Sequence, residues 1–83
     1  MPATMSPPMR IVVAETIAEE GLELLREHGE VDLAVGADRD DLLRRLAGAD
    51  ALVVRSATRV DPAVFAAAPN LKVVGRAGIG VDN

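Results

Sequence analysis

Two short runs, 51–54 and 71–74, consist of apolar residues apart from Lys72, and each is followed within two residues by arginine and small or glycine residues. An almost wholly apolar run of this length is typical of a buried parallel strand, which packs against helices on both faces. In parallel α/β sheets, ligands bind beyond the carboxyl ends of the strands. The two runs therefore predict neighbouring strands whose ends, with Arg55 and Arg76, face a single ligand crevice.

The rest of the chain predicts the sheet around these two strands. Further strands are expected over 10–14 and 30–35, and helical segments separate all four strands. The resulting β-α-β-α-β-α-β order predicts an α/β fold with a parallel sheet and right-handed crossovers. Charged and apolar residues alternate over 30–35, as in a half-exposed edge strand. We therefore expect a flavodoxin-like sheet with strand order 2-1-3-4, and an incomplete domain because the fourth strand has an uncovered edge.

Each helix has a predicted start. Thr16 and Glu19 have the spacing of a capping box, Asp38 can cap the second helix, and Asp61 precedes a proline suited to the first helical position. Gly29 is expected to end the first helix, where a lone histidine more often supports the helix dipole than binds a metal. Helical spacing selects the following residues in the first two helices: Ile17, Gly21, Leu24, Leu25 and His28, then Leu42, Leu43 and Leu46.

Composition narrows the function classes. The chain has 83 residues, which is at most one small domain, and its single aromatic residue leaves the core to Val, Leu, Ile and Ala. A net charge of −4 argues against nucleic acid or an anionic membrane as a partner. The absence of cysteine excludes disulfides, thiolate metal sites and cysteine nucleophiles. Residues 1–9 are expected to be a disordered lead-in rather than a signal peptide, and we expect a cytoplasmic protein without a membrane span.

The residues that follow the strands suit an anion. Guanidinium groups bind carboxylate or phosphate oxygens in pairs, hydroxyl groups add donors, and glycine lets a ligand approach main-chain N–H groups. An alternative is that Arg55 forms an ion pair with Glu15 or Asp82 and only closes the end of the sheet. The glycine-rich stretch 75–80 lacks the G-x-G-x-x-G fingerprint, because Asn83 stands where the third glycine would be. The acidic residues after Gly36 are expected to start a helix, and no metal site is expected.

Two stretches resemble the D-isomer-specific 2-hydroxyacid dehydrogenase family. They are 54–60, with Arg-Ser-Ala-Thr, and 69–83, which ends in Gly-Ile-Gly-Val-Asp-Asn; the first is more particular to the phosphoglycerate branch. The resemblance covers residues 10–83 and implies the N-terminal half of a discontinuous substrate-binding domain. It also implies NAD-dependent oxidation of the 2-hydroxyl of 3-phosphoglycerate to 3-phosphohydroxypyruvate, a step of serine biosynthesis, by a homo-oligomeric full-length enzyme.

Carried onto this sequence, the resemblance assigns substrate contacts but no catalytic group. The catalytic His, Glu and Arg of the family, like its NAD-binding domain, would lie beyond this chain, which alone should be inactive. Arg59 would assist the substrate phosphate. The resemblance implies substrate contacts for Arg55, Ser56, Thr58, Arg76, Ala77 and Gly78, and a nicotinamide contact for Ile79.

Two other functions remain open from the sequence. The full enzyme could act on another 2-hydroxy acid, of the glyoxylate or hydroxypyruvate type. The chain could also be a non-enzymatic, flavodoxin-like module that binds an anion or docks a protein. A phospho-receiver domain is disfavoured, because Glu15 and Arg55 stand where its acidic cluster and its phosphorylated aspartate would be needed.

Overall fold

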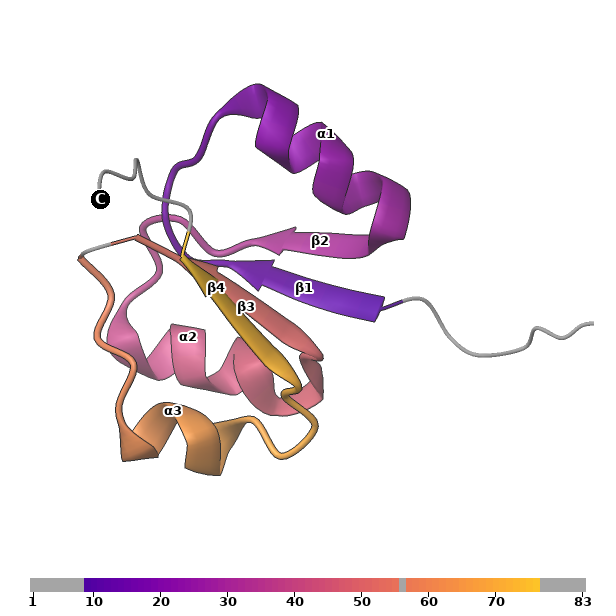
Figure 1. Ribbon diagram of the computed structural model, residues 1–83. Helices are drawn as coiled ribbons and strands as arrows, with labels where there is room; N and C mark the ends of the chain where they lie inside the picture. The colour runs from indigo at the N-terminus through magenta and orange to yellow at the C-terminus, as the bar shows by residue number, and fades with distance from the viewer. Residues whose placement is uncertain (1–8, 56, 77–83) are drawn as a thin grey trace, which may run out of the picture.

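The computed structural model describes residues 9–55 and 57–76, which form a parallel sheet with helices on both faces (Figure 1). The four strands lie in the order β2-β1-β3-β4, so the predicted α/β class and strand order are confirmed. The elements are β1 (Met9–Val13), α1 (Glu19–His28), β2 (Gly29–Leu33), α2 (Arg39–Arg45) with the 3-10 turn η2 (Leu46–Gly48), β3 (Ala51–Val54), α3 (Pro62–Ala67) and β4 (Val73–Arg76).

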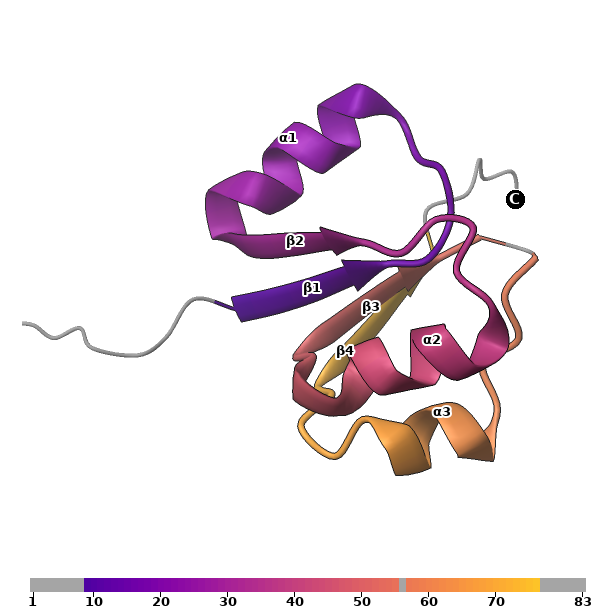
Figure 2. The same ribbon diagram turned by 180° about the vertical axis from the view of Figure 1, so that it is seen from behind.

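The sheet separates two unequal layers (Figures 1 and 2). On one face α1 runs along β1 and β2, and on the other face α2 and α3 lie side by side. Side chains alternate between the faces along a strand. Val12 and the paired Leu52 therefore face α2 and α3, whereas Ile11 and the paired Ala51 face α1.

The core is aliphatic, as the composition predicts. The larger part lies between the sheet and the α2–α3 layer, where Leu46, Leu52 and Val64 are fully buried. Each such side chain stabilises the fold by roughly 1.5–3 kcal/mol relative to an exposed position. Phe65, the lone aromatic residue, keeps 54% of its surface exposed and adds little to this core.

The predicted start of the first helix is wrong. The N-cap residue is Ala18, which makes no side-chain cap, and the helix begins at Glu19, so Thr16 does not form a capping box. Segment 14–18 instead follows the edge of the sheet, and the Thr16 carbonyl accepts a hydrogen bond from Arg55. Leu25 packs toward the sheet, whereas Leu24, which helical spacing placed on the same face, is 57% exposed.

The other two helix starts are confirmed. The Asp38 carboxylate accepts from the Asp41 N–H at 2.9 Å, and the Asp61 carboxylate accepts from the Val64 N–H at 3.4 Å, with proline in the first turn of α3. Near the end of α1, Nδ1 of His28 lies 3.1 Å from the Leu24 carbonyl oxygen, which fits the predicted role at the helix terminus.

Strand boundaries shift at both ends of the sheet. β1 already includes Met9, so the predicted lead-in reaches one residue too far. Gly29 is the first residue of β2, where a Cβ atom would clash with the Met9 carbonyl oxygen, so only glycine fits. β2 ends at Leu33, two residues before the predicted end, and a turn with Gly36 at φ 84° follows. β2 is nevertheless an edge strand, as predicted.

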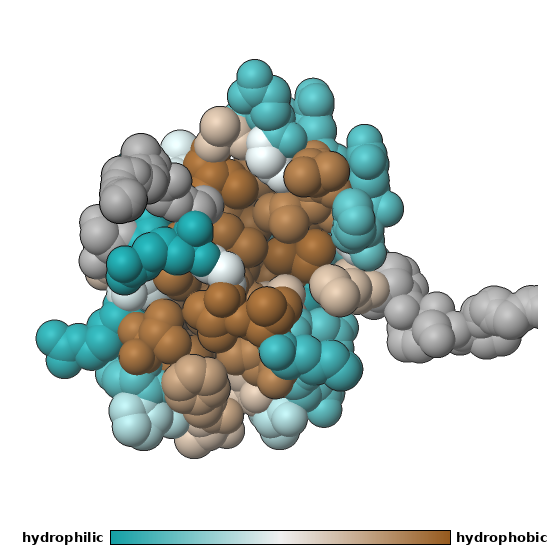
Figure 3. Space-filling view, viewed as in Figure 1, coloured by the Kyte–Doolittle hydropathy of each residue, from teal (hydrophilic) through white to brown (hydrophobic). Residues whose placement is uncertain are grey.

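The fourth strand begins two residues later than predicted. The register pairs Ala51 with Val73 and Val54 with Arg76, so Arg76 is the last residue of β4 rather than part of a following loop. Val73 is 52% and Val74 36% exposed. Figure 3 shows apolar side chains gathered around β4, the edge strand of the described sheet. Among the helices that the structure describes, none is long and apolar enough to cross a membrane.

Candidate functional site

Three connecting loops meet at the carboxyl ends of the strands (Figure 1). The Ala14 N–H donates to the Val53 carbonyl at 2.9 Å, and the Ala34 N–H donates to the Val13 carbonyl at 2.8 Å. These bonds carry the sheet pairing into the loops and place the segments after β1, β2 and β3 along one edge. We call this region the carboxyl edge and define it by residues 14–18, 34–38, 55 and 57–61, together with Arg76 at the end of β4.

A single carboxylate organises the loop after β3. Glu15 Oε2 accepts hydrogen bonds from the N–H groups of Arg55, at 2.6 Å, and Thr58, at 2.9 Å. Its Oε1 accepts from the N–H of Ala57 at 3.3 Å. Converging main-chain N–H groups of this kind form a concave site for an anion. In this chain the anion is a side chain from the neighbouring loop.

These contacts determine the protonation of Glu15. Partial burial alone would raise the pKa of Glu15. The hydrogen bonds with the Thr58 side chain and with the three N–H groups have the larger combined effect, so the pKa falls below its ordinary value of 4.5. The carboxylate is therefore ionised at neutral pH, which strengthens its hydrogen bonds to the loop.

The Arg55 guanidinium does not form an ion pair with the Glu15 carboxylate. Its Nη1 donates to the Thr16 carbonyl at 3.3 Å, and it forms no ion pair with any carboxylate in the described part of the chain. The predicted alternative of an Arg55–Glu15 ion pair is therefore wrong in form: the two residues bind each other, but through the Arg55 backbone. Asp82, the other suggested partner, lies outside the described residues.

The far half of the same loop is held from α2. Arg39 Nη1 donates to the Arg59 carbonyl at 3.0 Å, and Nη2 pairs with the Asp61 carboxylate at 2.6 Å. Beside these contacts lies an open groove of about 390 Å³, lined by Ala37, Arg39, Leu42, Ala57, Thr58, Arg59 and Asp61. The predicted residues Thr58 and Arg59 are thus brought together on one groove wall.

Arg55 and Arg76 share the edge, as predicted. Arg55 directly follows β3, and Arg76 ends the adjacent β4, one register step away, opposite Val54. Both side chains are exposed, as is that of Arg59. Across residues 9–55 and 57–76, none of these three arginines forms an ion pair with a carboxylate. The remaining predicted site residues lie outside the described residues: Ser56, Ala77, Gly78 and Ile79.

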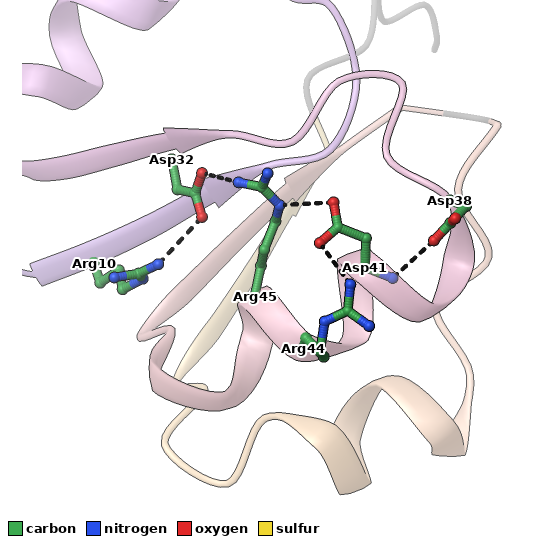
Figure 4. Close-up of polar contacts among 6 residues, drawn as sticks. All are labelled: Arg10, Asp32, Asp38, Asp41, Arg44 and Arg45. Atoms are coloured by element: carbon green, nitrogen blue, oxygen red, sulfur yellow. Dashed lines mark hydrogen bonds and ion pairs between the residues drawn. The ribbon is translucent and has the colours of Figure 1, made fainter.

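Away from the carboxyl edge, toward the amino ends of the strands, the charged side chains pair with one another. A chain of contacts links Lys72, Asp50, Arg10, Asp32, Arg45 and Asp41, which we call the amino-edge network. Asp32 pairs with both Arg10 and Arg45, and Arg45 pairs in turn with Asp41 (Figure 4). Asp50 accepts from the Arg10 N–H at 2.9 Å and pairs with Lys72 at 3.4 Å. Every cation of this network has a carboxylate partner.

Comparison with known protein families assigns the chain to a family. The family model described as D-isomer specific 2-hydroxyacid dehydrogenase, catalytic domain, matches residues 11–83. The chain belongs to this family. The resemblance drawn from the Arg-Ser-Ala-Thr element and the glycine-rich stretch is therefore confirmed.

Members of the dehydrogenase family from distant organisms match nearly the whole chain. A D-3-phosphoglycerate dehydrogenase of Archaeoglobus fulgidus is 49% identical over 76 residues, which is 90% of this chain and 14% of the relative. D-3-phosphoglycerate dehydrogenase 2, chloroplastic, of Arabidopsis thaliana is 51% identical over 78 residues, or 93% of this chain and 12% of the relative. The Methanocaldococcus jannaschii D-3-phosphoglycerate dehydrogenase is 45% identical over 75 residues. The chain thus spans about one seventh of these relatives' length.

The described residues do not suit a dinucleotide. A pyrophosphate on a Rossmann fold sits in a glycine-rich loop after the first strand, at a helix N-terminus. Here segment 14–18 contains no glycine, and it carries the ionised Glu15, which would repel a pyrophosphate. Within the same described residues, no cluster of three potential metal ligands occurs. The chemistry that these residues support is the binding of an anion by arginine.

Proposed function

We propose that this chain supplies one wall of the substrate cleft of an NAD-dependent dehydrogenase that oxidises the 2-hydroxyl of 3-phosphoglycerate to 3-phosphohydroxypyruvate. Membership of the 2-hydroxyacid dehydrogenase family and the names of the similar proteins support the reaction class and the substrate. The segment binds and orients the substrate; the hydride acceptor and the acid-base groups belong to other parts of the enzyme, so the 83-residue chain alone has no activity.

The observation that carries the proposal is the set of arginines at the carboxyl edge. Arg55, Arg59 and Arg76 are exposed and make no ion pair with any carboxylate among residues 9–55 and 57–76. One guanidinium can bind one carboxylate through two parallel hydrogen bonds. A substrate with both a carboxylate and a phosphate presents two such anions. Several arginines therefore favour a phosphorylated 2-hydroxy acid over a small monocarboxylate such as glyoxylate.

The test is a substrate panel on the complete gene product that contains this segment. NADH formation is measured with 3-phosphoglycerate and, in the same direction, with the unphosphorylated 2-hydroxy acids glycerate and glycolate. We expect kcat/KM in the phosphoglycerate direction to exceed that of unphosphorylated 2-hydroxy acids by at least about a hundredfold, since the phosphate adds a charge-assisted contact.

Two results would contradict the proposal. Equal kcat/KM values for phosphorylated and unphosphorylated substrates would show that the arginines do not select a phosphate, and would favour a dehydrogenase of another 2-hydroxy acid. Absence of NAD-linked turnover with every substrate of the panel would remove the enzymatic function, and titration of the chain with 3-phosphoglycerate would then test the anion-binding module.

A further inference from the structure

We infer that Glu15 is a positioning residue for the substrate: its carboxylate fills the main-chain anion site of the loop after β3, so that the loop is fixed and the substrate anion must be held by the arginine side chains. This inference deepens the proposed function and rests on it for the identity of the substrate. The geometry itself concerns the loop and can be tested without catalysis.

Glu15 makes more contacts with the loop after β3 than closing the end of the sheet requires. Glu15 lies 40 or more positions before its partners in the sequence, yet it accepts from three N–H groups of one short loop. The donors are the backbones of Arg55, Ala57 and Thr58, two of which are proposed substrate residues. A carboxylate that only closed the end of the sheet would need one such contact. Three contacts fix the direction in which the loop leaves β3.

The Glu15 carboxylate also excludes an anionic ligand from the N–H groups of the loop. N–H groups that converge on one point would otherwise bind a carboxylate or phosphate oxygen of a ligand. Because Glu15 already accepts from all three, and is ionised, an anionic ligand is repelled from these N–H groups. A substrate anion at the carboxyl edge is therefore directed to guanidinium groups. The Arg55 side chain extends from the same fixed backbone to the Thr16 carbonyl, beside the Glu15 position.

Glu15 and Arg39 support different halves of the loop. Arg39 holds only the far half, through the Arg59 carbonyl and Asp61, and these contacts continue into the N-cap of α3. Loss of Glu15 therefore leaves α3 attached but releases the half of the loop that begins at Arg55. Glu15 itself lies in segment 14–18, outside any helix or strand, so its side chain can be removed without breaking an element.

The test on the 83-residue chain uses amide NMR and three variants. In Glu15→Ala the carboxylate is missing and the Cβ atom remains, so acetate matches the deleted group. We expect the amide signals of Arg55, Ala57 and Thr58 to shift saturably with added acetate in Glu15→Ala and to stay unchanged in the wild type. Glu23→Ala, which removes an exposed carboxylate of α1, is the matched control and should respond as the wild type does.

A second substitution at the same position, Glu15→Gln, tests the inference even if Glu15→Ala fails to fold. In Glu15→Gln one oxygen can still accept from the Arg55 and Thr58 N–H groups, but the amide NH₂ then meets the Ala57 N–H, a donor facing a donor. The expected result is an upfield shift of the Ala57 amide proton with the overall spectrum retained. Unchanged amide shifts at all three positions in Glu15→Gln would overturn the inference, whatever Glu15→Ala does.

The complete gene product provides a functional readout. For Glu15→Gln we expect the KM for 3-phosphoglycerate to rise about tenfold, while kcat and the KM for NAD change by less than about twofold. For Glu15→Ala, added acetate should lower the raised KM again, which a merely destabilised protein would not show. An unchanged KM in an active enzyme would overturn the positioning role alone. An inactive wild type would overturn the proposed function and leave the NMR result to decide the role of Glu15.

Discussion

The amino-edge network and the carboxyl edge are built from the same residue types, yet they use them in opposite ways. At the amino edge, carboxylates bind cations: Asp32 alone holds both Arg10 and Arg45. At the carboxyl edge, the Glu15 carboxylate binds main-chain N–H groups. Asp61 pairs with Arg39 there, but Arg55, Arg59 and Arg76 have no carboxylate partner among residues 9–55 and 57–76. The difference separates arginines that hold the fold together from arginines that can hold a ligand.

The difference matters because the chain as a whole is acidic, with a net charge of −4. An arginine on such a surface readily finds a carboxylate, and most exposed pairs of this kind contribute little to stability. Arginines without a carboxylate partner among residues 9–55 and 57–76, beside a carboxylate that is bound by backbone N–H groups, form a local positive site for a small anion. The predictions below test this contrast.

The largest effect is expected for Arg55→Ala. Loss of a bidentate, charge-assisted contact removes about 2–3 kcal/mol of binding, so the KM of the complete gene product for 3-phosphoglycerate should rise about 30- to 150-fold. Stability should change by less than about 0.5 kcal/mol, since the side chain is exposed and its hydrogen bond within the described residues is the one to the Thr16 carbonyl. Steady-state kinetics and urea unfolding measure the two quantities.

The matched control for Arg55 is Arg44→Ala. Arg44 is also exposed, but it belongs to α2 and pairs with Asp41 at 3.2 Å. Its removal should leave the KM unchanged. A similar rise in KM for both variants would mean that net positive charge, rather than position at the carboxyl edge, determines substrate binding, and the contrast between the two edges would fail.

The next largest effect is expected for Asp32→Asn in the amino-edge network, where stability should change but substrate binding should not. The side chain of Asp32 is 19% exposed and bridges two guanidinium groups. Neutralising it should lower the free energy of unfolding by about 1 kcal/mol, because Arg10 loses its carboxylate partner and Arg45 keeps only Asp41. Urea unfolding measures this loss, with Glu23→Gln as the neutral control. The KM for 3-phosphoglycerate should not change; a tenfold rise would contradict a purely structural network.

Most of the fold follows from local patterns in the sequence. The strand order could be predicted because the run 51–54 is wholly apolar, as a central strand requires, whereas charges alternate through the second strand. Asp38 and Asp61 could be assigned as N-caps from their neighbours alone. The capping box at Thr16 was wrong, since the helix begins only at Glu19 and the Thr16 carbonyl instead accepts a tertiary hydrogen bond from Arg55. A single sequence carries no signal for such a contact.

The site could be predicted only in part, for a related reason. Arg55 and Arg76 were correctly placed at one edge, because strand order and strand ends determine their neighbourhood. The role of Glu15 was missed: its position after β1 suggested an ion pair, since charge is visible in a sequence and the direction of backbone N–H groups is not. The signal that could have revealed it is the adjacency of β1 and β3, together with a loop whose N–H groups need acceptors.

The smallest expected effect is in the acid stability of the two edges, where each holds a carboxylate of lowered pKa. The Arg10 N–H bond, with Lys72, lowers the pKa of Asp50 below 3.8, although partial burial opposes this. For Glu15 burial also raises the pKa, but the loop contacts lower it below 4.5. A carboxylate with a lowered folded pKa stabilises the fold above its unfolded pKa, and this contribution is lost as the pH falls through the folded value.

The two edges should therefore lose stability in successive ranges of pH. Urea midpoints of the wild type, Glu15→Gln and Asp50→Asn are compared from about pH 6 downward. The gap between the wild type and Glu15→Gln should begin to narrow below pH 4.5, and the gap for Asp50→Asn only below 3.8. A gap for either variant that stays constant through its range would show that the ionised carboxylate does not stabilise that edge. The N–H contacts of Glu15 or Asp50 would then hold equally well with the neutral group.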